Sequence, residues 1–280
     1  MKKSVILVAA FLGVISVSCG GSKQEKPKTE TETETVAQDT AEVKSQFVLP
    51  STVQVGQIFQ DAGLSYVSGV TNDPSSVSVY NTKVDKLLNY GIYSTDLSYC
   101  ILNNQNEESQ KYLMAVKTLS DDLGLSEIYE SDDLFERFKK AIGDEKAILD
   151  MMIEIQEKTD SYIDDNEFQS EALVIFTGAW VEGMYIGVKA SDPKNEHHIS
   201  ARLLEQMTVL DNMLNGLDVL KVKSKKLTDV KERLHKMQVT FENLEEVKNF
   251  KNYDGEFNLS MDNMVELANQ IVDLRTVIVN

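Results

Sequence analysis

The sequence predicts an all-α protein, a multi-helix bundle of about eight to nine helices around a central buried helix at about 167–190. Apolar residues recur with the 3.6-residue spacing of helices over long stretches. The 280 residues include only four prolines, so little interrupts these stretches. The segment 172–188, ALVIFTGAWVEGMYIGV, carries one formal charge, and a helix that is apolar on every side must be buried on every side.

The amino terminus has the features of an export signal. A basic pair precedes the apolar run 5–17, and small residues lead from there to Cys19. This arrangement resembles the lipobox of bacterial lipoproteins, which implies cleavage before Cys19 and lipidation of its sulfur. Ser16 stands where lipoboxes usually carry Leu, Val or Ile, so an ordinary signal-peptidase cut after Ser18 stays open. We expect residues 1–18 to be a signal peptide and the membrane to be a partner through lipidated Cys19.

Residues 19–46 are expected to form a disordered tether between the lipid anchor and the folded domain. From Ser22 onward the composition is rich in Lys, Glu, Thr and Gln, and bulky apolar side chains are almost absent. Such a tether would hold the domain a few tens of ångströms from the membrane, by the roughly √n scaling of flexible chains. The expected location is the cell envelope, on the periplasmic side of the outer membrane, with exposure at the cell surface left open.

The folded part is expected to be a single helical domain over 47–280, and its first half contains five helices. Pro50 begins the first, an apolar stripe defines the second, and Gly124 ends the third as a left-handed cap. The Ser-Asp-Asp run at 131–133 caps the fourth, and Asp144 begins the fifth. These helices are expected at about 50–67, 77–103, 107–123, 131–142 and 144–164.

The second half contains the central helix and three more. The central helix carries a stripe of small residues, Ala179, Gly183 and Gly187, along which a second helix backbone could approach closely. The Asp-Pro pair at 192–193 ends it. In the penultimate helix the alternating three-four apolar spacing covers fewer than three heptads, which is typical of a bundle seam. The last three helices are expected at about 196–220, 226–250 and 260–279.

Charge and missing motifs exclude several functional classes. The formal net charge of −17 disfavours nucleic acids and anionic lipid surfaces as partners, because phosphate binding needs clustered positive charge. The sequence contains no GxGxxG, GxxxxGK[ST], GxSxG or HExxH pattern, so nucleotide-binding, hydrolase and metalloprotease classes have no support. We therefore expect no enzymatic activity, no cofactor and no nucleic-acid partner.

Three groups of side chains could bind a metal or react, and none of their patterns favours it. Glu232 and His235 have the ExxH spacing of di-metal bundles, but the apolar stripe of their helix points away from both and a second ExxH is missing. The adjacent His197 and His198 would point about 100° apart on a helix and could not easily share a metal. Cys100 lies in an apolar run, where we expect a buried, inert thiol.

Two acids in apolar surroundings form the candidate site. Asp96 lies within the apolar run 87–102 and Glu182 lies within the central helix, and each is followed three residues later by a tyrosine. A carboxylate in a low dielectric must be paired, hydrogen-bonded or protonated. One interpretation is a network that fixes how the core helices register, and the other is a polar pocket for a ligand. The candidate buried polar pocket consists of Asp96, Glu182, Tyr93, Tyr99, Trp180 and Tyr185.

The settings of the two acids are alike. The first has the pattern G-x-Y-x-x-D-L-x-Y at 91–99, and the second has G-x-W-x-E-x-x-Y at 178–185. With these two stretches the chain resembles a group of uncharacterised all-helical lipoproteins of the bacterial envelope. The resemblance covers most of the domain and implies no activity. The likeness of the two stretches leaves two interpretations open: a weak internal duplication with a period near ninety residues, or a coincidence of the kind that helical sequences often produce.

These observations predict a lipid-anchored cell-envelope protein that acts as a binding or scaffolding module, with an envelope protein as the partner class. The alternative is a helical bundle that binds a small cationic ligand or metal in a buried polar pocket around Asp96 and Glu182. A solvent-filled cavity lined by both acids would favour the ligand pocket. A dry core in which both acids are paired would favour the scaffold.

Overall fold

The computed structural model confirms the predicted fold class. Its described residues lie in one compact unit of the chain and form ten α-helices and one 3-10 helix, without a strand among them. The predicted signal, tether and Cys19 lie outside the described residues, as does all of the helix expected at 50–67 except its last two residues, which are not helical. The structure describes residues 66–130, 133–190, 196–250 and 257–280.

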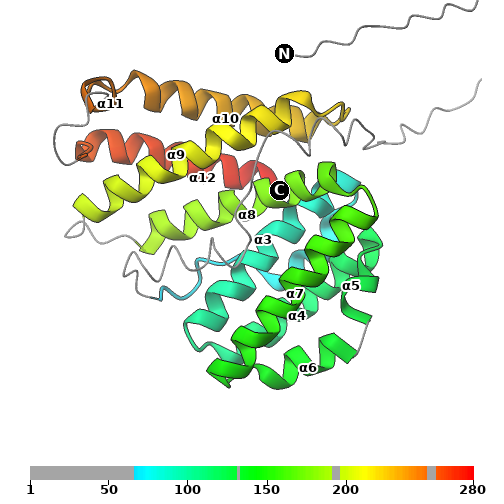
Figure 1. Cartoon of the computed structure of the whole chain (residues 1–280). Coiled ribbons are helices and arrows are strands. Elements are labelled where there is room, and N and C mark those ends of the chain that lie inside the picture. Colours follow the sequence, from blue (N-terminus) through cyan, green and yellow to red (C-terminus); the bar gives the residue numbers. More distant parts are fainter. Residues whose placement is uncertain (1–65, 131–132, 191–195, 251–256) are drawn as a thin grey trace, which may run out of the picture. The chain divides into compact units, whose positions relative to one another are not determined.

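Helices α3 (Lys83–Leu102) and α8 (Gln169–Ala190) form the centre of the bundle and share the most extensive contact between any two described helices (Figure 1). Of the described helices, α8 is the one long and apolar enough to span a membrane, but 67% of its apolar window is buried inside the protein. The predicted central buried helix is therefore confirmed, and its apolar surface is covered by other helices.

The backbones of α3 and α8 touch where each helix has a glycine. A Cβ atom on Gly91 would overlap the carbonyl oxygen of Ile175, and a Cβ atom on Gly178 would overlap the carbonyl oxygen of Leu88. The approach is reciprocal, because each glycine lies against the backbone of the other helix. Only a residue without a side chain fits at these two positions.

The predicted stripe of small residues on α8 is only partly correct. Ala179 does lie against α3, since its carbonyl oxygen accepts a hydrogen bond from Thr95 Oγ1 at 3.2 Å. The closest approach, however, occurs at Gly178, which lies about 100° around the helix from Ala179 and outside the four-residue repeat. Glycine permits a closer contact than alanine, so this position sets the spacing of the two helices. Gly183 is buried and Gly187 is half-buried.

Two clusters of apolar side chains flank the central pair. The first joins α3 and α8 to α9, α10 and α12, and the second joins the opposite face of α3 to α4, α5, α6 and α7 (Figure 1). Ile175 of α8 packs against both clusters. The surrounding helices are α4 (Asn106–Leu123), α5 (Ser126–Glu130), α6 (Leu134–Ala141), α7 (Glu145–Asp165), α9 (Glu196–Val219), α10 (Lys225–Asn243) and α12 (Met261–Val279).

The helix expected at 77–103 begins later than predicted. Residues Pro74–Val79 form a separate 3-10 helix, η1, in which the side chain of Asp73 accepts a hydrogen bond from the second following backbone N–H. Helix α3 then begins with a capping box in which Thr82 and Asp85 each accept a hydrogen bond from the other's backbone N–H. Apolar periodicity runs through this junction, so the capping residues decide the boundary.

The structure differs from the sequence analysis at three other places. The helix expected at 226–250 divides at Leu244, whose backbone is extended, and the acidic start of α11 (Glu245–Phe250) suits the amino end of a new helix. The sequence did not predict the five-residue α5, because a helix this short does not show an apolar periodicity. Asp133 does not cap α6 with its side chain; it adopts a left-handed backbone with φ of 54°. Gly124 and Asp144 cap α4 and α7 as expected.

Candidate functional site

Asp96 and Glu182 meet in the interface between α3 and α8. Glu182 follows Gly178 by four residues and therefore lies one turn further along the helix face that contacts α3. Both acids are 0% exposed, and their carboxyl groups interact with each other. Asp96 Oδ1 has no N–H or O–H donor within reach among the described residues. The two acids singled out from the sequence share one site.

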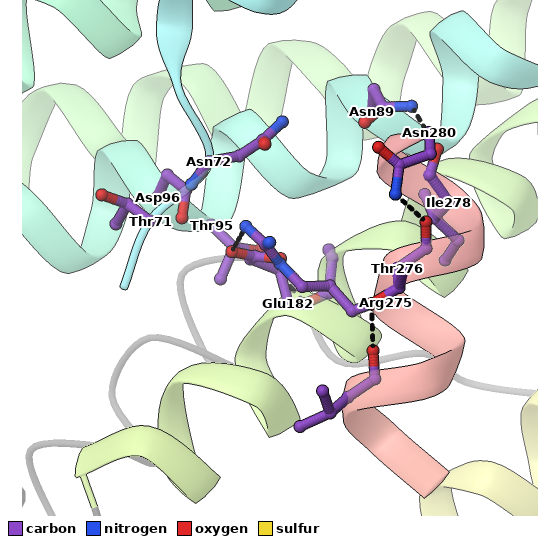
Figure 2. Close-up of polar contacts among 12 residues, drawn as sticks. Thr71, Asn72, Asn89, Thr95, Asp96, Glu182, Arg275, Thr276, Ile278 and Asn280 are labelled. Carbon is purple, nitrogen blue, oxygen red and sulfur yellow. Dashed lines mark hydrogen bonds and ion pairs between the residues drawn. The ribbon is translucent and has the colours of Figure 1, made fainter. Parts of the chain in front are cut away.

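Arg275 of α12 supplies the positive charge of this site (Figure 2). Its Nε donates to Glu182 Oε2 at 2.8 Å and its Nη2 donates to Glu182 Oε1 at 3.0 Å. The ring of Tyr185 covers the guanidinium, with its centroid 4.3 Å from Arg275 Cζ. A bidentate, charge-assisted contact of this kind is among the strongest hydrogen-bonded pairs in proteins. Glu182 therefore has its own counter-ion.

The surroundings favour the protonated form of Asp96 more strongly than that of Glu182. Burial raises the pKa of Asp96 well above its usual range, and the neighbouring charge of Glu182 raises it further, against the effect of the Asn72 backbone N–H that donates to Asp96 Oδ2 at 3.0 Å. Burial also raises the pKa of Glu182, but the contact with Arg275 opposes that shift. A proton on Asp96 would allow its carboxyl group to donate to Glu182, its neighbour in this site.

The predicted tyrosines of α3 bind the chain's own segment 66–73. The hydroxyl of Tyr93 donates to the carbonyl oxygen of Asp73 at 2.8 Å. The hydroxyl of Tyr99 accepts the Val67 backbone N–H at 2.8 Å, and its ring stacks on Tyr66 with a centroid distance of 5.4 Å. These two side chains therefore hold the segment 66–73 against α3.

Two further tyrosines fix the part of this segment that contacts Asp96. The hydroxyl of Tyr112 lies 2.7 Å from Thr71 Oγ1 and 2.9 Å from the carbonyl oxygen of Asn72. The Asn72 side-chain amide donates to the hydroxyl of Tyr80 at 3.0 Å. Figure 2 shows Thr71 and Asn72 where the chain passes Asp96. The backbone N–H that binds Asp96 is thus held in place from two sides.

Trp180 lies apart from the two acids. Its indole Nε1 donates to Gln206 Oε1 of α9 at 3.0 Å, and its ring belongs to the apolar cluster that joins α8 to α9, α10 and α12. The structure therefore brings Tyr185, Asp96 and Glu182 together around Arg275, and it places Trp180 in the core on another face of α8.

The other side chains considered for chemistry are buried or solvated. Cys100 is 1% exposed, and burial raises the pKa of its thiol to about 12, which agrees with the expected buried, inert cysteine. Glu232 is exposed, and His235 Nε2 lies 3.1 Å from Asp218 Oδ1. The side chains of His197 and His198 lie outside the described residues. Within the described ranges, no three His, Cys, Asp or Glu side chains are grouped for a metal.

Comparisons with protein-family models, with curated proteins and with solved structures found no match for this chain. The site is therefore interpreted from its own contacts. It joins α3, α8, α12 and the segment 66–73 through one buried ion pair and the contacts of Asp96 with Glu182 and the Asn72 backbone N–H. Such an arrangement fixes the register of helices, because each helix must place its polar group opposite the others.

Arg275 is the residue of this site that the sequence patterns missed. It is the only Lys or Arg that follows Lys251, and it stands beside the apolar stripe of Leu267, Ile271, Leu274 and Ile278. A lone basic residue at the edge of a buried stripe, in a chain with two acids in apolar segments, is a usable signal for an ion pair. The contact of Asn72 with Asp96 left no comparable signal, because it uses only the backbone.

We expect Asp96→Asn to be tolerated, since the amide can accept the Asn72 N–H and donate to Glu182 as the protonated acid does. The raised pKa of Asp96 means that wild type loses stability as pH rises from about 4, the unfolded value, through the folded value. Asp96→Asn does not lose stability in this way, because asparagine does not titrate. Urea unfolding should place it within about 1 kcal/mol of wild type at pH 4, with its relative stability increasing towards pH 8.

The matched control is Asp229→Asn, at an exposed ion pair with Arg233. It should differ little from wild type at any pH, because exposed pairs contribute little. If Asp96→Asn instead costs about 3 kcal/mol or more of unfolding free energy at pH 7, Asp96 is ionised in the folded protein, which contradicts the prediction.

Proposed function

We propose that this protein is a lipid-anchored module of the cell envelope that acts by binding or scaffolding. The observation that supports this function is the internal neutralisation of the buried Asp96–Glu182 centre. Glu182 accepts hydrogen bonds from two of the three nitrogens of the Arg275 guanidinium, and Asp96 is bound by the Asn72 backbone N–H and lies beside Glu182. These groups are used to hold helices together, so they are poorly placed to act on a substrate.

The amino-terminal pattern supports the location. Cys19 follows an apolar run and small residues, and the acidic, polar stretch behind it suits a tether. The net charge of −17 suits a soluble acidic domain held beside a membrane and does not suit a nucleic-acid partner. An envelope protein is the partner class that fits this setting.

The alternative, a pocket for a small cationic ligand or metal, meets a specific obstacle. The guanidinium of Arg275 already occupies the position opposite Glu182 that a cation would take. A cation could bind there only after Arg275 left an environment in which its side chain is 13% exposed. Displacing a buried, hydrogen-bonded ion pair costs several kcal/mol, roughly as much as removing one of its partners.

The lipid anchor is tested with Cys19→Ser, with Cys100→Ser as the matched control. Wild type and the control should partition into the detergent phase, and their intact masses should show a mature chain that begins at a lipid-modified Cys19. Cys19→Ser should appear in the aqueous phase without the lipid mass. A wild-type chain with an unmodified thiol at Cys19, or one cleaved after Ser18 without lipid, would refute the anchor.

The binding role is tested in the same cells by chemical cross-linking. Wild type should form a discrete adduct with an envelope protein, and Cys19→Ser should lose most of it because the tether no longer holds the domain at the membrane. A wild-type protein that forms no adduct in the envelope, yet gains thermal stability from added divalent cations, would favour the ligand-pocket alternative.

A further inference from the structure

A cavity of about 220 Å³ lies between α7 and the pair of helices α3 and α8, away from the buried acids. Helix α7 packs mainly on α5 and α6, so part of its inner face stands off from α3 and leaves this space. An engineered apolar cavity of about 150 Å³ binds benzene, so a space of this size can hold a substituted aromatic ring or a short acyl chain. The apolar wall includes Leu97, Val116, Met152, Ile155, Ile175 and Phe176.

The cavity wall carries a hydrogen-bond donor that the protein does not use. Tyr90 and Tyr129 both line the cavity, both are only 8% exposed, and their hydroxyl oxygens lie 2.6 Å apart. Two hydroxyls bring two protons, and the contact between them uses one. No acceptor for the second proton is found among the described residues. A buried donor without a partner is costly, so a bound oxygen atom there would be stabilising.

The other hydroxyls of the wall are already engaged. Ser94 donates to the carbonyl oxygen of Tyr90 at 2.7 Å, and Ser98 donates to the carbonyl oxygen of Ser94 at 3.0 Å. The remaining proton of the Tyr90–Tyr129 pair is therefore the donor that could orient a ligand. Both phenols stay neutral at physiological pH, because burial raises the pKa of each above its ordinary value.

The charge around the cavity indicates an uncharged ligand. Asp160 is the charged residue of its lining, and the side-chain amide of Gln156 donates to it at 2.8 Å. A carboxylate or phosphate group would meet this acid and an overall acidic protein without a lysine or arginine in the lining. An anion entering the cavity would therefore lose its hydration without gaining a positively charged partner, which is unfavourable.

We propose that this cavity binds a small, uncharged and mostly apolar molecule whose carbonyl or ether oxygen accepts the remaining proton of the Tyr90–Tyr129 pair. The ligand class is thus an aromatic or short-chain ketone, ester or ether. This site is separate from the Asp96–Glu182 centre, and it stands whether or not the protein is lipid-anchored.

The test compares acetophenone with ethylbenzene, which have the same ring and nearly the same size but differ in the carbonyl group. Dissociation constants come from titrations of the protein's methyl resonances. For each ligand, the dissociation constant of the Tyr90→Phe/Tyr129→Phe variant is divided by that of wild type. The hydration of the free ligand is the same in both measurements and therefore cancels. We expect the double variant to weaken acetophenone binding about 5- to 10-fold and to leave ethylbenzene within about twofold, since one hydrogen bond is lost.

Two controls make the result specific. Tyr129→Phe alone leaves Tyr90 with one free proton, so it should keep most of the preference for acetophenone. Ala172→Leu fills the cavity from α8 and should abolish binding of both ligands, whereas Ala201→Leu, on the exposed face of α9, should change neither. The proposal fails if wild type binds neither ligand, if Ala172→Leu binds both as wild type does, or if the double variant weakens both ligands equally.

Discussion

Arg275→Leu should lower the free energy of unfolding by about 3–5 kcal/mol, the typical cost of leaving a buried charge without its partner. Glu182 is 0% exposed and takes both of its strong hydrogen bonds from Arg275. Without the guanidinium, its carboxylate would face the carboxyl group of Asp96 in a low dielectric. Urea unfolding at pH 7 measures the effect, provided that the slope of the transition is unchanged.

Arg233→Leu is the matched control, because Arg233 pairs with Asp229 on the surface. That change should cost no more than about 1 kcal/mol. Adding Glu182→Gln to Arg275→Leu should restore much of the lost stability, since the remaining site would then carry no charge. If Arg275→Leu costs no more than Arg233→Leu, the ion pair does not hold the helices together and the cation pocket becomes the better interpretation.

Gly178→Ala should also destabilise the fold severely, by about 1–3 kcal/mol or more. The added methyl group would overlap the carbonyl oxygen of Leu88, and a backbone atom cannot move aside as a flexible side chain can. In an open helix the same change is favourable by about 0.5–1 kcal/mol, so the expected sign is opposite to helix propensity. Thermal unfolding measures it, at about 2–4 °C per kcal/mol for a domain of this size.

Gly187→Ala, at a half-buried position near the carboxyl end of the same helix, is the control and should be neutral or slightly stabilising. Gly91→Ala should match Gly178→Ala, because the two glycines face each other's helices. A Gly178→Ala protein that melts at or above the wild-type midpoint would show that α3 and α8 are not in backbone contact.

Most helices could be assigned from the sequence, because periodicity and capping are local properties. The helix at 144–164 was expected from Asp144 and an apolar stripe, and it is found at Glu145–Asp165. The errors arise where an apolar pattern continues across a junction. An extended Tyr80 and the Thr82 capping box separate η1 from α3, and an extended Leu244 separates α10 from α11. Periodicity does not register such single-residue changes of backbone direction.

The candidate site could be predicted in part. Asp96 and Glu182 were recognisable because a charge in an apolar segment requires compensation, and they do meet. Trp180 was grouped with them by sequence proximity alone, and the 100° rotation per residue carries it to another face of α8. Arg275 is 93 residues from Glu182, so no local pattern could connect the two.

The sequence by itself determined the helical fold class, the burial of the helix at 169–190 and the need of two acids for partners. These properties depend on composition and spacing along one helix at a time. The tertiary structure alone decided that Arg275 pairs with Glu182, that Gly91 and Gly178 mark the crossing of α3 and α8, and that the hydroxyls of Tyr90 and Tyr129 are hydrogen-bonded at a cavity wall. Each of these contacts joins segments far apart in the chain, and their choice depends on how whole helices pack.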